Sequence, residues 1–353
     1  MVGSQQNQRP RVELYSDTKT RPSPGMIQAM GAAEVGDEQA LEDPTTLMLE
    51  ERTADLLGKE AALFLPSGTM CNQIALQIHC RPGDAVLADR SAHIIGFEGG
   101  GAGATGGVNI LPLDGVRGVY TVDQARVAIP APGNRYAPRV TLIEVEQTSN
   151  LGGGTVWPLE RLDALGDLAR ERGLALHMDG ARLMNAVAAS GISASRMVQA
   201  TDSVWIDLSK GLGCPVGAVL AGTKDFIAEA WRIKQRMGGA LRQSGYLAAA
   251  GLYALDHNLE RLAEDNANAR RFADGIAGLP GILLDPATVE TNIVFYELGA
   301  DAPMDAHALS KALMERGVRI GAFSKTSMRA VTHLDVDRAG IEEAIAAMTE
   351  LLE

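Results

Sequence analysis

A lysine at the end of an apolar run is the residue with the clearest chemical potential. Lys210 follows the run 203–208 and enters a bend rich in glycine and proline, SVWIDLSKGLGCPVG (203–217), which cannot continue as a helix. A lysine at the end of a buried strand is costly unless its amine is used, and a desolvated amine is a competent Schiff-base nucleophile. A lysine in a surface loop after a strand is the alternative interpretation, and Lys210 alone does not separate the two.

A second candidate is the aspartate of HMDGAR (177–182). Asp179 ends the apolar strand expected at 174–178, where open α/β sheets place their ligands. A carboxylate there can keep a pyridinium nitrogen protonated, which makes a pyridoxal ring an electron sink. Capping the next helix is the alternative role, and Asp179 can do both. Arg182 can pair with Asp179, with a ring hydroxyl or with a substrate carboxylate.

Two further signals are weak alone. The segment PSGTMCNQ (66–73) reads as a strand, a turn and a helix start, so Gly68 and Thr69 offer a phosphate free N–H groups and a hydroxyl. It lacks the lysine of a nucleotide-triphosphate loop. His93, after another strand, can stack on an aromatic cofactor or act as a base, although a lone histidine is more often a hydrogen-bonded loop residue. Together with Lys210, these residues indicate a pyridoxal 5′-phosphate (PLP) enzyme.

The elements that must position these residues alternate between strand and helix, which predicts an α/β fold with a mostly parallel sheet. We expect a flexible tail over 1–12, a large cofactor-binding domain over 13–250 and a smaller α+β domain over 251–353. A single long helix, 245–263, is expected to link the two domains, and the glycine-rich segment 99–107 is expected to be a tight loop. The other expected elements are strands at 61–65, 85–88, 140–145, 174–178, 203–208, 216–221, 291–296, 319–321 and 329–332, and helices at 26–30, 47–57, 70–79, 159–172, 226–237, 304–316 and 339–352.

The composition excludes several classes of partner. A net charge of -12 argues against nucleic acid and anionic membrane surfaces, which both favour basic proteins. The three scattered cysteines suit reduced thiols, and no spacing typical of a metal site is present. No stretch approaches the roughly 18 apolar residues of a membrane span, and the polar start is unlike a secretory signal. We therefore expect a cytoplasmic protein that acts on a small molecule.

In order along the chain, eight segments resemble the low-specificity L-threonine aldolases, from about residue 12 to the C-terminus. That resemblance implies the fold-type I, aspartate-aminotransferase-like architecture and a homo-oligomer, a dimer with shared active sites and commonly a tetramer. The segments are SDTKTRPSPGM, EVGDEQALEDPT, LLGKEAALFLPSGTMCNQIAL, HMDGARLMNA, LSKGLGCPVG, MGGALRQSGYLAAAGLYAL, TNIVFYEL and RAVTHLDV.

The resemblance also implies roles for individual residues. Lys210 would carry the cofactor as a Schiff base, His93 would stack on its ring, and Asp179 would pair with the ring nitrogen. Gly68 and Thr69 would bind the phosphate. The remaining implied contacts are Arg242 on the phosphate from a neighbouring subunit, Arg182 on both cofactor and substrate, and Ser16 and Arg329 on the substrate carboxylate.

The implied reaction is retro-aldol cleavage of L-threonine or L-allo-threonine to glycine and an aldehyde. Where the family reads ENTHN this chain reads EQTSN (146–150), so Ser149 replaces a substrate-side histidine. His93 acting through a water is then the leading candidate base. Ala40 and Leu41 replace a tyrosine and a glycine in a segment that helps to wall the active site. Both departures leave other PLP reactions open: phenylserine-type cleavage, transaldol exchange, β-elimination or racemisation. A non-catalytic PLP-binding protein is a third possibility, which the joint presence of Lys210, Asp179 and His93 disfavours.

Overall fold

A seven-stranded sheet forms the centre of the protein, whose computed structural model describes residues 9–131 and 133–353. From one edge to the other its strands are β2 (Ala61–Leu65), β8 (Ala218–Gly222), β7 (Ser203–Asp207), β6 (Ala175–Gly180), β5 (Val140–Glu146), β3 (Ala85–Asp89) and β4 (Asn109–Leu113). The strands from β7 to β4 run parallel, and β8 is antiparallel to both of its neighbours. The predicted mostly parallel α/β sheet is therefore confirmed.

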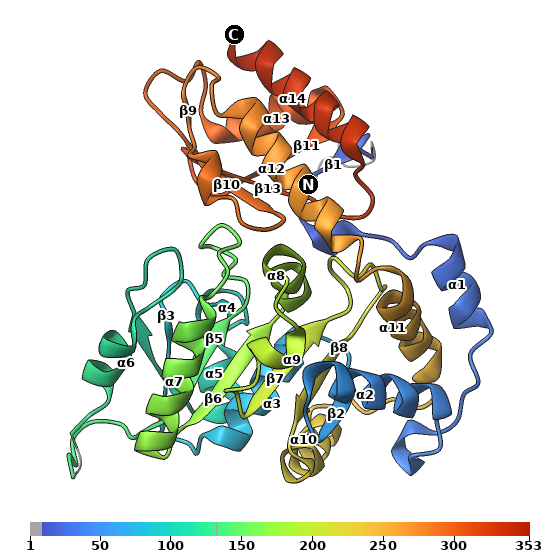
Figure 1. The fold of residues 1–353 in the computed structure, drawn as a ribbon, viewed down its shortest axis with the longest axis vertical. Coiled ribbons are helices and arrows are strands. Elements are labelled where there is room, and N and C mark those ends of the chain that lie inside the picture. Colours follow the sequence, from blue (N-terminus) through green and yellow to red (C-terminus); the bar gives the residue numbers. More distant parts are fainter. Residues whose placement is uncertain (1–8, 132) are drawn as a thin grey trace, which may run out of the picture.

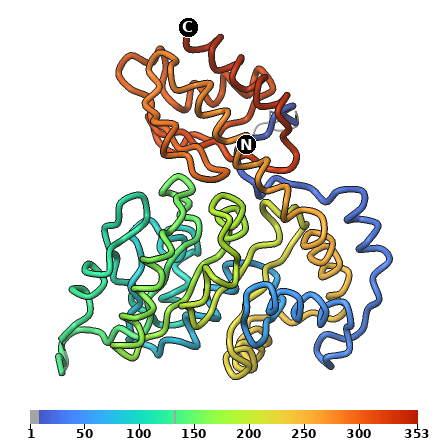
Figure 2. Tube along the Cα trace, in the orientation of Figure 1, coloured from blue at the N-terminus to red at the C-terminus, as the bar shows by residue number. Residues whose placement is uncertain are grey.

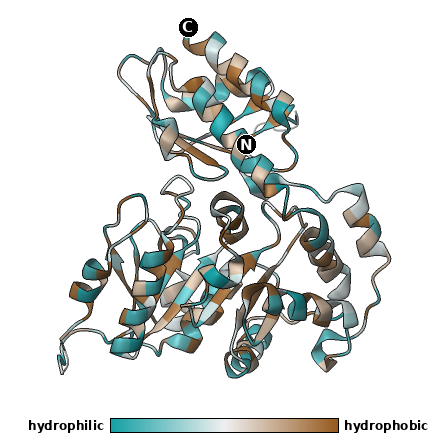
Figure 3. Ribbon diagram, in the orientation of Figure 1, coloured by the Kyte–Doolittle hydropathy of each residue, from teal (hydrophilic) through white to brown (hydrophobic). Residues whose placement is uncertain are grey.

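Both faces of this sheet are buried, and alternate residues of each strand enter different apolar cores. Leu63 and Leu65 of β2 join the core on the side of α3 (Gly68–His79) and α10 (Lys224–Arg236). Phe64, between them, points to the other side, where α2 (Pro44–Leu57) and α7 (Leu159–Arg172) pack. Figure 1 shows the sheet between these helices, and Figure 3 shows hydrophilic and hydrophobic residues alternating along the ribbons. This two-sided burial explains the near-continuous apolar strands in the sequence.

Shorter helices complete the large lobe, by which we mean the elements from η1 to α11. The expectation of a tight loop over 99–107 was wrong, because α5 (Gly101–Gly106) lies there and packs on α3. At Gly101 a Cβ would lie 2.6 Å from the side chain of Gln73, so glycine allows this close packing. The other elements are η1 (Asp17–Lys19), α1 (Pro24–Gly31), η2 (Glu38–Ala40), α4 (His93–Gly96), α6 (Val122–Ala128), α8 (Leu183–Ser190) and α9 (Ala194–Met197).

The connection to the C-terminal elements consists of two helices. A continuous helix over 245–263 was expected, but α11 (Gly245–His257) ends before α12 (Leu262–Ile276) begins. Asn258 follows the end of α11, and its side-chain amide donates to the carbonyl of Leu212 at 2.7 Å. This bond ties the helix end to the bend that follows Lys210, which helical periodicity alone does not reveal.

The C-terminal elements from α12 onward, with β1 (Val12–Glu13), form the small lobe. Its antiparallel sheet has the order β12 (Gly321–Ala322), β13 (Ser327–Val331), β10 (Ile293–Leu298) and β9 (Ile282–Leu283), and β1 pairs in parallel with β11 (Val318–Arg319). Its helices are α12, α13 (Ala306–Glu315) and α14 (Arg338–Leu352), with η3 (Pro286–Thr288) before β10. In Figure 2 the blue N-terminal chain lies beside the orange and red C-terminal tube.

The N-terminal chain thus contributes to the C-terminal core. Val12 and Leu14 are buried in the same apolar cluster as Ile341 of α14. Residues 1–8 of the expected tail lie outside the described residues, and the domain boundaries at 12/13 and 250/251 remain predictions. Within residues 9–131 and 133–353, no helix is both long and apolar enough to cross a bilayer. The described structure has Cys71, Cys80 and Cys214 as buried thiols without a disulfide.

Candidate active site

Lys210 lies just beyond the end of β7 with its side chain only 16% exposed. Its Nζ is 2.9 Å from Oδ2 of Asp207 and 5.6 Å from the centre of the Trp205 ring. Its backbone carbonyl accepts hydrogen bonds from Thr20 and from the N–H of Gly213. The predicted lysine is therefore held in a mostly buried bend, as the sequence indicated.

Asp179 lies in neighbouring strand β6 and is buried. Its Oδ2 accepts a hydrogen bond from the amide of Asn72 at 2.8 Å, and its Oδ1 accepts the N–H of Ala181 at 3.0 Å. Burial raises the pKa of Asp179 above its ordinary value, against the opposing charges of Lys210 and His93. The expected helix cap was wrong, because α8 (Leu183–Ser190) begins after Arg182 without a side-chain cap, and Oδ1 of Asp179 instead stabilises the turn at Ala181. The role of Asp179 toward a ring nitrogen remains a prediction.

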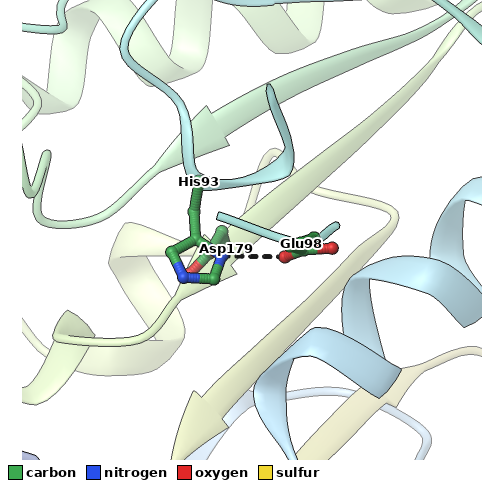
Figure 4. A group of neighbouring side chains, drawn as sticks. All are labelled: His93, Glu98 and Asp179. Atoms are coloured by element: carbon green, nitrogen blue, oxygen red, sulfur yellow. Dashed lines mark hydrogen bonds and ion pairs between the residues drawn. The ribbon is translucent and has the colours of Figure 1, made fainter. Parts of the chain in front are cut away.

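His93 begins α4 and reaches the same group of side chains (Figure 4). Its Nδ1 is 2.9 Å from Oε1 of Glu98, which also accepts from Asn72 at 2.7 Å, while Oε2 accepts from Gln73 at 2.6 Å. Burial disfavours the charged imidazole, but the hydrogen bond to Glu98 leaves the pKa of His93 raised above its ordinary value. The His93 ring stacks on Phe97 with centroids 5.5 Å apart.

The three groups of Figure 4 lie close enough to resemble a metal site. One ligand-type atom from each of His93, Glu98 and Asp179 lies within 4.8 Å of the others. Amide groups of Asn72 and Gln73 already donate to the two carboxylates. Both carboxylates therefore already have neutral hydrogen-bond donors and do not require a metal ion as a partner. The aromatic, nitrogen-containing ligand that the sequence analysis expects between His93 and Asp179 remains a prediction.

The helix start predicted to bind a phosphate is present at α3. Ser67 caps the helix by accepting from the N–H of Met70, and Thr69 is exposed in the first turn. At Gly68 a Cβ would lie 2.1 Å from the Trp205 ring, so only glycine lets the chain pass over that ring. The exposed first turn leaves backbone N–H groups available to an anion.

The groups expected to hold a substrate carboxylate come from both lobes. Arg182 is buried and makes a bidentate ion pair with Asp17, at 2.7 and 2.8 Å. This pair holds the pKa of Asp17 well below its usual range, although burial acts in the opposite direction. Ser16 is buried beside it and accepts from the N–H of Thr18 at 3.2 Å. Arg182 is thus occupied by Asp17, a partner that the sequence analysis did not consider.

Arg329, on β13 of the small lobe, differs from Arg182. Its Nη1 donates to Oδ1 of Asn150 at 2.6 Å, while its buried Nε has no hydrogen-bond partner. Among the described residues no carboxylate lies within 4.0 Å of it, and burial and the charge of Arg182 lower the pKa of Arg329 to about 10. A buried guanidinium without an anion has unused capacity to bind a carboxylate.

The loop after β5 joins these parts. Glu146 is buried, and its two oxygens accept the backbone N–H groups of His93 at 2.7 Å and of Asn150 at 2.6 Å. Burial and the neighbouring Asp179 raise the pKa of Glu146 to about 7. The hydroxyl of Ser149 accepts the N–H of Gly152 at 3.2 Å, so this side chain is engaged within its own loop.

Arg242 is not brought into this cluster. Its side chain is 61% exposed and pairs with Asp37 at 2.8 Å, and its carbonyl accepts the N–H of Glu38. Ala40 and Leu41 follow directly, and Leu41 adopts a left-handed backbone with φ 58° and an exposed side chain. Arg242 and the two residues that differ from the family, Ala40 and Leu41, therefore share one exposed edge of the large lobe.

Sequence reasoning missed several members of the site. They are all acids or amides: Asp17, Asn72, Glu98, Glu146 and Asp207. The sequence offered one signal for two of them: Asp17 directly follows Ser16, and Glu98 lies five positions after His93. Tertiary packing decides which hydrogen-bond donor each of these carboxylate and amide oxygens faces, and the sequence does not show it.

Comparisons with known proteins show the family of the chain. A family model described as beta-eliminating lyase matches residues 13–298. The chain is 42% identical over 336 residues to the low specificity L-threonine aldolase of Escherichia coli (strain K12), with 95% of this chain and 97% of that protein covered. It is 38% identical over 345 residues to low-specificity L-threonine aldolase 1 of Arabidopsis thaliana, with 97% and 96% covered.

Solved structures show the same fold at lower identity. A threonine aldolase of Leishmania major superposes with a TM-score of 0.82 at 19% identity, covering 97% of this chain and 100% of that one. A structure of SPT with PLP gives a TM-score of 0.72 at 17% identity, covering 96% and 86%. The expected fold-type I architecture is confirmed.

Proposed function

The chain belongs to the beta-eliminating lyase family and, within it, to the low-specificity L-threonine aldolases, and from this membership we propose that it cleaves L-threonine and L-allo-threonine to glycine and acetaldehyde with PLP as cofactor. The observation that supports the proposal most is that Lys210, Asp179 and His93 all lie at the carboxyl ends of parallel strands, where the charges of Lys210 and His93 both act on Asp179. Residues of three different strand ends converge there, where α/β folds bind their ligands.

The residues present fit the cofactor. Lys210 would hold it covalently through Nζ, and Asp179 would face the ring nitrogen from a buried position that Asn72 keeps fixed. The first turn of α3, at Gly68 and Thr69, would hold the phosphate. When bound, PLP supplies a protonated ring that accepts the electron pair released at the substrate Cα.

Arg329 is proposed to bind the substrate carboxylate. Its Nε has no partner, its Nη1 is aligned by Asn150, and no acid of the described chain neutralises it. Arg182 would support this contact from its pair with Asp17, and Ser16 lies directly beside that pair. Fixing the carboxylate in this way orients the substrate so that the bond to be broken can align with the ring.

His93 is proposed to handle the proton of the β-hydroxyl. Glu98 accepts from Nδ1, which fixes the ring and leaves Nε2 as the site that takes up a proton. Glu146 receives the backbone N–H of His93 and positions the start of α4. Ser149 cannot replace a histidine as base, because a hydroxyl remains protonated at neutral pH.

A second copy of the chain is proposed to complete each site. Arg242 is exposed on an edge that the buried cluster does not contact, so it is available to reach the phosphate of a neighbouring subunit. The proposal therefore includes a dimer with shared active sites, which can associate further into a tetramer.

The experiment is product analysis on three substrates. Purified protein supplied with PLP is incubated with L-threonine, L-allo-threonine and L-phenylserine, and glycine and aldehyde are both quantified. Equal amounts of the two products from the threonines support the proposal. Ammonia and a keto acid in place of glycine would assign the protein to elimination instead.

Three residues that differ from the family pattern, Ala40, Leu41 and Ser149, predict the relative rates in the same experiment. Ser149 and Ala40 are smaller than the family residues, whereas Leu41 is larger than glycine. We expect weaker discrimination between the two threonines and relatively faster cleavage of the larger phenylserine. Ser149→His, assayed in parallel, tests whether position 149 causes this preference.

A further inference from the structure

Asp207 is a buried acid in direct contact with the cofactor lysine. Its Oδ2 lies 2.9 Å from Nζ of Lys210, and the two side chains are 6% and 16% exposed. Its other oxygen, Oδ1, accepts the N–H of Ser209 at 2.7 Å and the hydroxyl of Ser209 at 2.8 Å. The two oxygens therefore have separate partners: Oδ1 closes the turn after β7, and Oδ2 faces the lysine amine.

An aromatic ring completes the surroundings of the amine. Nζ lies 5.6 Å from the centre of the Trp205 ring, close enough for a cation–π attraction. The ring is fixed because its Nε1 donates to Oδ1 of Asn72 at 2.7 Å and because Gly68 passes directly over it. Carboxylate and ring thus define one place for a lysine ammonium that is not bonded to a cofactor.

No other acid of the described residues contacts this amine. Asp17 and Asp179 experience the charge of Lys210, but neither lies within 4.0 Å of Nζ. A mostly buried ammonium without a direct partner is strongly disfavoured, so the contact with Asp207 carries most of its stabilisation.

We propose that Asp207 is a positioning residue that receives the Lys210 ammonium each time a substrate amine replaces the lysine on the cofactor. The inference rests on the proposed function, because it requires the lysine-bound cofactor. In the exchange the carbon–nitrogen double bond passes from Nζ to the substrate nitrogen. The substrate nitrogen, which enters as an ammonium with three protons, keeps one, and Nζ, which carried one, leaves with three. The proton count and the total charge are unchanged, but the charge on Nζ, which was shared with the conjugated cofactor, is then held wholly by the free ammonium beside Asp207.

This role favours one side of the exchange. The released ammonium holds its whole charge and three N–H donors beside Asp207, whereas the bonded nitrogen has one N–H and shares its charge with the conjugated cofactor, so the carboxylate stabilises the substrate-bound state over the lysine-bound state. It also holds Nζ in a fixed place from which the lysine can return after product formation. Loss of the carboxylate should therefore weaken apparent binding of any amino acid that displaces the lysine.

Glycine titration of the PLP-loaded protein tests this without turnover, because glycine has no β-carbon to lose. The visible absorbance of the cofactor is followed as glycine displaces Lys210. In Asp207→Asn the amide oxygen can keep both contacts of Ser209, while an NH2 group replaces the acceptor that faced Nζ. We expect the half-saturating glycine concentration to rise about tenfold, the size of one lost hydrogen bond to a charged group, with PLP retention and the unfolding midpoint unchanged.

Three controls separate the ion pair from other effects. Asp207→Glu restores the charge and should recover part of the affinity. Ser209→Ala removes a contact of Oδ1 only and should shift the glycine curve less than Asp207→Asn. Glu229→Gln removes the acid of an exposed pair with the same spacing, Arg232–Glu229 at 3.6 Å, and should change nothing.

The outcomes are distinct. A glycine curve for Asp207→Asn that matches the wild type contradicts the role of Asp207 while the proposed function stands. A loss of PLP retention that accounts for the whole shift would assign Asp207 to cofactor binding and also overturns the inference. A wild-type protein without a lysine-bound cofactor would overturn both the proposed function and this inference.

Discussion

Arg329 of the small lobe donates from Nη1 to Oδ1 of Asn150 in the large lobe over 2.6 Å, while its buried Nε has no partner. Asn150 is in turn held by Glu146, which accepts its backbone N–H at 2.6 Å. The guanidinium is therefore aligned before substrate arrives, and the groups that align it also reach His93. Such pre-alignment lowers the cost of binding because little freedom is lost when the substrate enters.

Arg329→Ala should raise KM for L-threonine by about 10²-fold, since a bidentate, charge-assisted contact with the carboxylate is lost. The visible band of bound PLP should remain, because Arg329 does not contact the cofactor cluster. Arg319→Ala on β11 of the small lobe is a suitable control, since that arginine pairs with Glu13. An unchanged KM in Arg329→Ala would show that the carboxylate binds elsewhere.

Glu98→Gln should move the pH profile of kcat/KM. His93 accepts a proton only in its neutral form, so activity should rise with pH through the pKa of His93, which Glu98 raises above about 6.5. Replacing the carboxylate by a neutral amide removes that effect, and the midpoint should fall. The measurement is kcat/KM for L-threonine from pH 5.5 to pH 9 in both proteins. A profile that keeps its midpoint would remove His93 from the role of base.

Glu50 predicts a pH dependence of stability unrelated to catalysis. Burial raises its pKa to about 7, although Oε1 accepts the N–H of Phe64 at 2.9 Å. In the unfolded chain the group titrates near its ordinary value, so between about pH 4.5 and pH 7 the unfolded state loses the proton first and the free energy of unfolding falls. The decrease should be on the order of 3 kcal/mol. Denaturant unfolding at pH 5 and pH 8 should show it in the wild type together with the contribution of Glu146, whose pKa is also raised to about 7, and Glu50→Gln should remove only the part that belongs to Glu50. Equal pH slopes in the two proteins would contradict this assignment.

Subunits that carry different inactivating substitutions should restore activity when they form mixed dimers. Lys210→Ala removes the covalent attachment, and Arg242→Ala should weaken PLP retention in a neighbouring subunit. Dissociating and mixing the two inactive proteins should restore up to a quarter of the wild-type activity, because one of the two sites in a mixed dimer then holds both intact residues and half of the dimers are mixed. Absence of any recovery, with mixed dimers detected by mass, would place Arg242 in the site of its own chain.

Strand positions and strand ends were the predictable part of this protein. Period-2 and continuous apolar runs located β2, β5, β6 and β7, and the residues that follow parallel strands must meet at one edge, which is why Lys210 and Asp179 were found together. The division of 245–263 into two helices was missed because the bond found at the end of α11, from Asn258 to Leu212, is tertiary and leaves no periodic signal in the sequence. The helix at 101–106 was missed because glycine disfavours helices locally, and packing on Gln73 decides otherwise.

Pairings among acids and bases were less predictable. Arg182 was expected to pair with Asp179 or with a ligand, but its partner in the structure is Asp17, 165 positions earlier in the chain. Asp207 was read as part of an apolar strand, and only the bend after β7 turns its carboxylate toward Lys210. Contacts of this kind depend on the direction of single side chains at the ends of elements, and the periodicity of a sequence does not specify that direction.

The central claim is that Lys210 carries PLP in an enzyme that splits threonine, and reductive trapping measures it most directly. The protein is loaded with PLP, treated with borohydride, digested and analysed by mass spectrometry, with untreated samples assayed for glycine and acetaldehyde from L-threonine. The account predicts a phosphopyridoxyl group on the peptide that contains Lys210, loss of aldolase activity on reduction, and neither modification nor activity in Lys210→Ala. A reducible cofactor bond that persists in Lys210→Ala, or full aldolase activity in that variant, would contradict the account.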